Sequence, residues 1–221
     1  MVQGRLRVLA QVGPLQFWRR VGNIAQKSSL GMIFVWPNIM RRHHLILTGI
    51  PASGKSTIAR ALSAELGWEI LDKDEILEDL FNEKGIGDLH WRTILSRTAD
   101  EILRERTSRS ESSMIVSWWR HPASTIVSGR PIEWLSDLPG VLIEIRCICD
   151  PAIAVERFKS RIRHRGHLDQ FKPPDDLLAS FQQQAALGPL GIGHLIEVNT
   201  ESTVELAHLL SLINSLINID S

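Results

Sequence analysis

The chain has 221 residues, and its 25 Lys and Arg residues balance its 25 Asp and Glu residues, so the formal net charge is zero. This length fits one domain, or one domain with an extension. Apolar residues form 43% of the sequence and charged residues 23%, which excludes the intrinsically disordered and fibrous classes. No apolar run approaches the roughly 18 residues that cross a bilayer, so we expect no membrane partner.

The charge is unevenly distributed along the chain. Residues 1–39 contain five basic residues and no acidic one, whereas residues 40–221 carry 20 basic against 25 acidic residues, a net of −5. This contrast predicts an N-terminal extension over residues 1–39 and a folded domain over residues 40–221. The extension is Arg-rich and acid-poor like a transit peptide, but it is thin in serine. We favour the interpretation that Met40 is the natural start.

Cys147 and Cys149 are the two cysteines of the sequence, too few for a disulfide framework. We interpret both as reduced apolar residues, because free cysteine packs as a small hydrophobic side chain. Reduced cysteines are typical of proteins inside the cell, so the sequence predicts a cytoplasmic location.

Hydrophobic periodicity from Met40 onward predicts alternating strands and helices. The expected strands cover residues 44–48, 69–71, 114–118, 141–148 and 195–198. The expected helices cover residues 55–66, 74–83, 91–108, 151–163, 175–187 and 203–217. Such alternation requires crossover connections, so the predicted fold is a three-layer α/β fold with a mostly parallel, five-stranded sheet.

The segment between the first strand and the first helix carries the strongest chemical signal, because it matches G-x-x-x-x-G-K-[ST]. The expected nucleotide-binding residues are Gly49, Ile50, Pro51, Ala52, Ser53, Gly54, Lys55, Ser56 and Thr57. Glycines in such a loop let backbone N–H groups converge on phosphate oxygens at a helix N-terminus. Lys55 can reach the β- and γ-phosphates, and the Ser56 hydroxyl can take one position on Mg²⁺.

The absence of other signature motifs favours a small kinase-like member of the phosphate-loop proteins. No Asn-Lys-x-Asp guanine motif and no Leu-Ser-Gly-Gly-Gln transporter signature occurs in the sequence. Residues 137–140 spell D-x-x-G but precede the fourth strand, so we interpret them as a turn.

Two carboxylates, Asp72 and Asp74, follow the second expected strand. The carboxyl ends of parallel strands face the ligand crevice, so both side chains are expected there. We expect Asp72 to help hold Mg²⁺ and Asp74 to orient or deprotonate the incoming hydroxyl. The alternative is that one of them merely caps the next helix.

Basic residues crowd the end of the helix that follows the fourth strand. The members expected to stabilise a transferring phosphoryl group are Arg161, Arg163 and Arg165. We interpret this run as a lid that also excludes water, although a solvated helix face is the simpler alternative.

Trp118, Trp119 and Arg120 follow the third strand on the same expected ligand side. Paired tryptophans at a strand end are usually packing residues, whereas Arg120 is a candidate for binding an anionic or polar part of the acceptor. Ser117 stands where many phosphate-loop enzymes place an aspartate, which would leave more of the metal binding to Asp72.

The phosphate loop, Asp72-Lys73-Asp74 and the Arg-rich run together resemble the small P-loop kinases of the AAA family ATPase group. That group includes zeta-toxin-like proteins, polynucleotide kinase, chloramphenicol phosphotransferase, gluconate kinase and shikimate kinase. The resemblance covers about residues 43–217 and implies a helical lid, with ATP and Mg²⁺ as cofactors. It also implies that Asp74 is the general base and that Asn199 and Thr200 lie beside the adenine.

The predicted function is therefore ATP-dependent phosphotransfer to a hydroxyl of a small molecule, by a monomer or dimer. The acidic domain argues against extended nucleic acid as a partner. Leu77, where polynucleotide kinases have an arginine, argues against a nucleic-acid end as the acceptor. Two alternatives stay open: a kinase for a nucleotide-sugar or nucleic-acid end, and a nucleotide-binding regulatory module without turnover.

Overall fold

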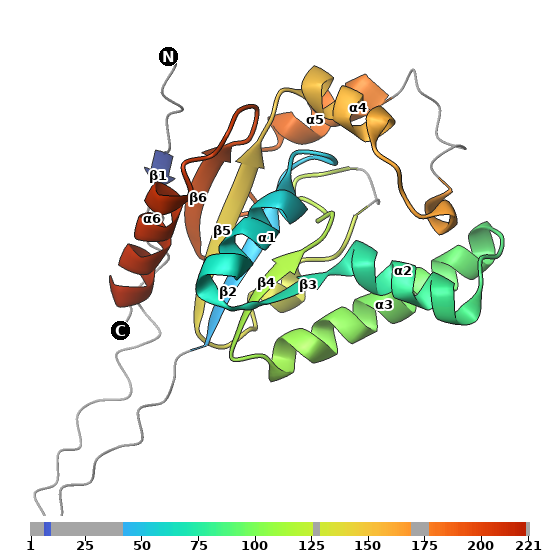
Figure 1. Ribbon diagram of the computed structural model, residues 1–221, viewed down its shortest axis with the longest axis horizontal. Helices are drawn as coiled ribbons and strands as arrows, with labels where there is room; N and C mark the ends of the chain where they lie inside the picture. Colours follow the sequence, from blue (N-terminus) through green and yellow to red (C-terminus); the bar gives the residue numbers. More distant parts are fainter. Residues whose placement is uncertain (1–6, 10–41, 126–128, 169–176, 220–221) are drawn as a thin grey trace, which may run out of the picture.

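The computed structural model describes residues 7–9, 42–125, 129–168 and 177–219. Its centre is a sheet of six strands in the order β1-β6-β5-β2-β4-β3 (Figure 1). The strands are β1 (Arg7–Leu9), β2 (His43–Thr48), β3 (Glu69–Asp72), β4 (Ser112–Val116), β5 (Val141–Ile148) and β6 (His194–Asn199). The five predicted strands are confirmed, and they pair in parallel throughout.

Two features of the sheet differ from the sequence prediction. A short strand, Arg7–Leu9, within the residues predicted to form an extension, pairs antiparallel with β6 at the edge of the sheet. Its three residues are too few to produce a periodic signal. The strand β4 ends at Val116 rather than at Trp118, and the Trp119 indole instead donates a hydrogen bond to the Leu47 carbonyl at 3.0 Å. The transit-peptide and upstream-start interpretations fall mainly on residues outside those that the structure describes.

In the part of the chain that the structure describes, six α-helices connect and cover the strands, as predicted. They are α1 (Lys55–Leu66), α2 (Lys73–Lys84), α3 (Leu89–Arg109), α4 (Pro151–Ser160), α5 (Leu177–Ala186) and α6 (Leu206–Ile219). The predicted extension of the fourth helix to residue 163 is wrong, because α4 ends at Ser160 and Arg161 is extended (φ −75°, ψ 138°). None of the helices in the described ranges is both long enough and apolar enough to span a membrane.

Alternate residues of the central strand face two different hydrophobic layers, as a strand requires. Leu45 and Leu47 of β2 pack with α1 and α6, whereas Ile46 packs with α2 and α3 on the opposite face. Cys147 is buried and free, and burial raises its pKa to about 12. Cys149 is likewise buried and free, so the interpretation of both as reduced apolar residues is confirmed.

Candidate active site

The phosphate loop lies at the carboxyl end of the central strand β2 and leads into α1. Gly49 has a φ of +127°, and a Cβ there would lie 2.5 Å from the Cys147 carbonyl oxygen. Gly54, which precedes α1, has a φ of +92°. Both conformations favour glycine, since a side chain would be strained or would collide. The two glycines of the motif are therefore required by the backbone path, which brings the loop N–H groups together at the start of a helix.

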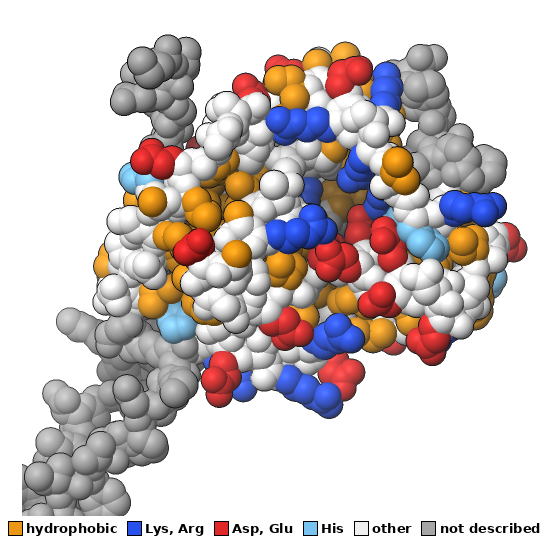
Figure 2. All heavy atoms as spheres, in the orientation of Figure 1, with side chains coloured by type: hydrophobic (Ala, Val, Ile, Leu, Met, Phe, Trp, Pro, Cys, Tyr) orange, Lys and Arg blue, Asp and Glu red, His pale blue; other side chains and the backbone are white. Residues whose placement is uncertain are grey.

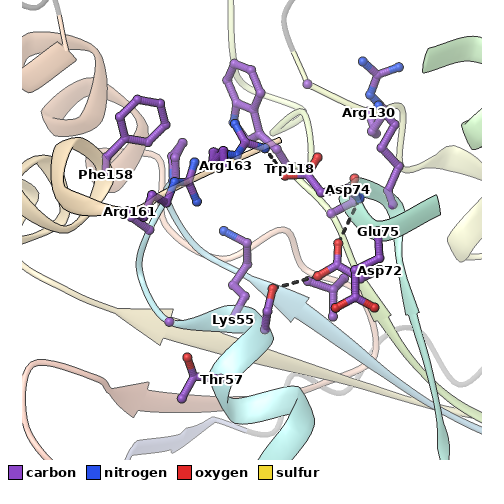
Figure 3. A pocket seen from close by; sticks show the side chains of 18 of the residues that line it. Lys55, Thr57, Asp72, Asp74, Glu75, Trp118, Arg130, Phe158, Arg161 and Arg163 are labelled. Atoms are coloured by element: carbon purple, nitrogen blue, oxygen red, sulfur yellow. Dashed lines mark hydrogen bonds and ion pairs between the residues drawn. The ribbon is translucent and has the colours of Figure 1, made fainter. Parts of the chain in front are cut away.

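Lys55 points from the first turn of α1 into the cavity described below (Figure 3). Its ammonium donates hydrogen bonds to the Gly49 carbonyl at 3.0 Å and the Ile50 carbonyl at 2.9 Å. Burial lowers the pKa of Lys55, and the negative charges of Asp72 and Asp74 oppose this shift. The ammonium is thus held against the loop, where phosphate oxygens would attract it.

Asp72 joins the phosphate loop to α2 through its two carboxylate oxygens. Its Oδ2 accepts a hydrogen bond from the Ser56 hydroxyl at 2.7 Å, and its Oδ1 accepts one from the Asp74 N–H at 2.9 Å. The second bond makes Asp72 the N-cap of α2, so the capping alternative is confirmed for this residue. Burial raises the pKa of Asp72, which the Ser56 hydrogen bond counteracts.

The Ser56 and Asp72 oxygens fit the ligand chemistry of Mg²⁺. Both are hard oxygen donors, and they are adjacent at 2.7 Å. Within the described ranges, no group of three or more His, Cys, Asp or Glu residues could hold a metal ion. Mg²⁺ usually binds through one or two protein oxygens together with substrate phosphates and water, which matches such a pair.

Asp74 stands in the first turn of α2 with its side chain 52% exposed to the cavity, and Arg163 forms an ion pair with it. Burial alone would raise the pKa of Asp74, but the positive charges of Arg163, His167 and Lys73 outweigh that effect and lower it. Asp74 is therefore ionised and can accept a proton or a hydrogen bond from a neighbouring hydroxyl.

The Arg-rich run lies at the end of α4 and in the segment that follows it, and only some of its side chains line the cavity. Arg161 and Arg163 line the cavity, and the Arg161 guanidinium lies 4.5 Å from the centre of the Phe158 ring. Arg165 is exposed in the short helix Arg165–His167 and does not line the cavity. The Arg157 guanidinium donates to the Thr200 carbonyl at 3.0 Å, so it ties α4 to the end of β6.

The segment after α4 is docked on α2 by contacts that the sequence analysis did not anticipate. The His164 ring stacks on Phe81 at 5.3 Å between centroids. The His167 Nε2 lies 2.8 Å from a Glu78 oxygen, and the His167 ring is edge-on to Phe81. Burial, followed by the charge of Arg163, lowers the pKa of His167. This docking places Arg163 opposite Asp74.

Gly166→Ala is expected to weaken the docking. A Cβ at Gly166 would overlap the Phe81 ring, so the ring or the docked segment must move. Overpacking of this kind costs about 1–3 kcal/mol. We expect the segment after α4 to detach from α2, while the free energy of unfolding of the rest of the domain stays unchanged. Trypsin should then cleave at Arg161 and Arg163 faster in the variant, whereas Glu83→Ala, at an exposed position of α2, should leave cleavage unchanged. Equal cleavage of both variants would contradict the docking.

Asn199 and Thr200 lie at the end of β6. The Asn199 side-chain oxygen accepts a hydrogen bond from the Glu201 N–H at 2.8 Å, and Asn199 does not line the cavity. The Thr200 hydroxyl lies 2.6 Å from the Ser53 carbonyl and 3.0 Å from the Ile148 carbonyl, so it fixes the phosphate loop against β5 and β6. Thr200 also lines the cavity, and contact of either residue with adenine stays a prediction.

These elements surround a cavity of about 1570 Å³, hollowed between α2 and the segment after α4 (Figure 2). Its size exceeds the roughly 300–1,000 Å³ typical of a single small-molecule site, which leaves space for two ligands. Arg120, a predicted acceptor residue, lines it and donates to the Gly129 carbonyl at 3.3 Å. Ser117, Trp118, Arg92 and Arg130 line it as well.

Comparison with known proteins gives the following similarities. The family model for the AAA domain matches residues 45–187. Shikimate kinase from Moorella thermoacetica (strain ATCC 39073 / JCM 9320) is 34% identical over 62 residues, which are 28% of this chain and 32% of that protein. The chain thus spans about a third of the length of this curated relative.

Two solved structures are similar over most of the chain. A protein from Chloroflexus aurantiacus J-10-fl, provisionally named a kinase, has a TM-score of 0.63 at 22% identity, covering 83% of this chain and 100% of its own. Shikimate kinase from Acinetobacter baumannii in complex with shikimate has a TM-score of 0.51 at 20% identity, covering 79% of this chain and 94% of its own. At these identities the likeness is one of fold.

Proposed function

This chain belongs to the AAA domain family and has the fold of the P-loop kinases, and from that premise we propose that it transfers the γ-phosphoryl group of ATP to a hydroxyl of a small molecule. The observation that carries the proposal is the short chain of contacts from Ser56 through Asp72 to Asp74. It joins a candidate metal position at the phosphate loop to the Asp74 carboxylate, which faces the same cavity.

Phosphoryl transfer depends mainly on positioning and on charge stabilisation. The loop N–H groups and Lys55 would bind the phosphates, and Arg161 and Arg163 would neutralise the charge that develops on the transferred group. Ser56 and Asp72 would hold Mg²⁺, which supplies further charge neutralisation when bound. Since these side chains line one cavity together with Pro51, Ala52 and Gly54 of the loop, a single nucleotide can meet them together.

Asp74 would orient the acceptor hydroxyl and receive its proton. The ion pair with Arg163 occupies this carboxylate in the structure. ATP phosphates would compete for the same guanidinium, so nucleotide binding would draw Arg163 towards the phosphates and free Asp74 for the acceptor. Asp74 would then be available as a base only after the nucleotide has bound.

Lys55→Met tests the proposal, because it removes the ammonium from the loop and retains a side chain of similar length. Incubation of the wild-type chain with ATP, Mg²⁺ and pooled hydroxyl metabolites is expected to give a phosphorylated product, detected by mass spectrometry. Loss of one charge stabiliser in a dry site lowers kcat by roughly 100–1,000-fold. Lys84→Met, at the exposed end of α2, is the matched control and should retain the activity. Equal product from wild type and Lys55→Met would contradict the proposed role.

A regulatory module that binds ATP without turnover is the second candidate. The ion pair of Asp74 with Arg163 favours it, since a permanently occupied carboxylate cannot serve as a base. Ser117 at the end of β4, in place of an aspartate, also favours a module without turnover. Tight ATP binding by calorimetry, with neither transfer nor hydrolysis over a broad acceptor panel, would support this candidate against the kinase.

A further inference from the structure

The side of the cavity beyond Asp74 is strongly cationic. In Figure 3, Asp74 lies between Lys55 on one side and Arg130 on the other. The acids Asp74, Glu75 and Glu78 of α2 also line the cavity, but they pair with Arg163, Arg60 and His167. We call the acceptor wall the remaining charged cavity residues contributed by the start of α2, by α3 and by the segments around Arg120 and Arg130. Its members are Lys73, Arg92, Arg97, Asp100, Glu101, Arg104, Arg120 and Arg130. Cations therefore outnumber acids on this wall, in a domain whose net charge is −5.

Most of the wall is built into the fold, since Arg97, Glu101 and Arg104 are exposed but its other members are buried or half-buried. Lys73 is 5% exposed, and its ammonium donates a hydrogen bond to the Ser96 hydroxyl of α3 at 2.6 Å. Arg130 forms an ion pair with Asp100, and its side chain is largely buried. Backbone hydrogen bonds from Arg120 N–H to the Arg130 carbonyl and from Arg130 N–H to the Trp118 carbonyl, both at 2.8 Å, fix this segment beside the end of β4.

The positive charges of the wall act on one another. The charges of Arg130 and Arg92 both act on the buried ammonium of Lys73. Only one oxygen of Asp100 contacts Arg130, and its other oxygen is buried without a hydrogen-bond partner. With Asp100 and Glu101 as its two acids against six cations, the wall has an excess of positive charge that an anion in the cavity would neutralise.

We propose that the acceptor carries an anionic group besides its reactive hydroxyl, and that Arg130, Arg92 and Lys73 bind this group. The inference rests on the proposed function, because it assigns the far side of Asp74 to the acceptor. A hydroxyl placed at Asp74 leaves the remainder of the molecule facing the acceptor wall (Figure 3). Guanidinium groups pair with carboxylate and phosphate oxygens in the same forked geometry, so the shared chemistry is a small hydroxylated oxyanion.

The buried hydroxyl of Ser117 supports the same placement. It lines the cavity at the end of β4, is 6% exposed, and has an oxygen without a hydrogen-bond partner in the structure. A buried hydroxyl without a partner is costly, and a polar ligand atom beside it would supply one. The cavity beside Asp74 therefore offers a polar group, Ser117, next to the cationic acceptor wall. A hydroxylated anion could use both, its hydroxyls at Ser117 and its charge at the wall.

Two matched sets of probes test the proposal and distinguish carboxylate from phosphate. D-sorbitol, D-gluconate and D-sorbitol 6-phosphate share a six-carbon chain, and glycerol, D-glycerate and glycerol 3-phosphate share a three-carbon chain. Binding to the ADP-loaded full chain is measured by calorimetry, and transfer from ATP by mass spectrometry. In at least one set an anionic member should bind about 10–100-fold more tightly than its neutral partner, the gain expected from one charge-assisted pair.

Variants of the wall connect this preference to named residues. Arg130→Gln and Arg92→Gln should each abolish most of the preference for the anion and leave the KM for ATP unchanged, whereas Arg130→Lys should retain most of it. Arg109→Gln is the matched control, because Arg109 lies on the same helix as Arg92 but at its exposed end, paired with Glu105. Circular dichroism and urea unfolding exclude a folding defect in each variant.

The outcomes separate this inference from the proposed function. Preference for the neutral members, equal binding within both sets, binding by none of the six probes, or a preference that survives in Arg130→Gln and Arg92→Gln would each overturn the anionic subsite. Phosphorylation of a neutral alcohol alone would do so while upholding the kinase. Anion binding that depends on Arg130 in a chain that never transfers phosphate would uphold the subsite and contradict the kinase.

Discussion

Asp74→Asn is expected to abolish phosphate transfer while ATP binding is retained. The amide cannot accept a proton, and general-base assistance contributes about 100–10,000-fold to a rate. The substitution retains the size of the side chain and removes its charge, and it leaves the contact of Ser56 with Asp72 intact. The expected result is a fall in kcat of that order, measured by single-turnover transfer of labelled phosphate, with the affinity for ATP changed by less than about threefold.

Asp79→Asn is the control for this experiment, because Asp79 is an exposed residue of the same helix α2. It should transfer phosphate like the wild type. A kcat of Asp74→Asn within about threefold of the wild-type value would show that Asp74 is not the base.

The pH dependence gives an independent check on the same carboxylate. Asp74 must be ionised to accept a proton, so kcat/KM, which reports the free enzyme with its ion pair to Arg163, falls as the pH falls through the pKa of Asp74. The charge of Arg163 helps to hold the pKa of Asp74 below its ordinary value, so the acid limb of the wild-type profile lies below the usual aspartate range. Arg163→Gln removes that charge, and the limb should move to higher pH. A limb that stays in place would contradict the assignment of the base.

Glu144→Gln is expected to have the largest effect on stability. Glu144 lies on β5 with 1% of its surface exposed, among the buried residues of the sheet. Its Oε1 accepts hydrogen bonds from the Thr48 hydroxyl and the Leu190 N–H, both at 2.9 Å. Its Oε2 accepts from the Gly191 N–H at 2.9 Å. The carboxylate thus fixes the loop before β6 to the strand that leads into the phosphate loop.

An amide at this position has one acceptor oxygen and would turn an N–H group towards buried donors. Loss of hydrogen bonds to a charged group, together with an unsatisfied buried N–H, costs about 2–4 kcal/mol. Urea unfolding should show this loss as a lower midpoint with an unchanged slope. Glu69→Gln, an exposed carboxylate on β3, should change the unfolding free energy by less than about 0.5 kcal/mol. Equal effects of the two substitutions would contradict the role of Glu144.

The sequence was sufficient for those parts of the fold and site that depend on neighbouring residues. The phosphate loop, the strand before it and the helix after it form a local pattern of glycines and apolar spacing. The positions of the five parallel strands and six helices were predicted for the same reason. The end of α4 was not, because Arg161 to Arg163 continue a good helical composition yet leave the helix to dock on α2.

The charge pattern of α3 could have been found in the sequence but was missed. Arg97, Asp100 and Arg104 recur at intervals of three and four residues, which places them along one side of a helix, and Arg92 lies one turn and a half earlier on the same half of the helix. Nothing local indicates that this side faces the cavity, since charged residues on a helix usually face solvent. The parallel packing of β3 beside β4 brings α2 and α3 together and turns that side towards Asp74.

The amino-acid sequence by itself determined that this chain has a phosphate loop, that acids follow the second predicted strand, and that a net charge of zero averages basic residues 1–39 and acidic residues 40–221. Its tertiary structure alone decided which charges meet. Arg163 lies 89 positions from Asp74 in the chain, and Asp100 lies 30 from Arg130. Phosphate-loop geometry is set by short-range backbone constraints, whereas the pairing of distant charges depends on how the helices pack, which no local pattern encodes.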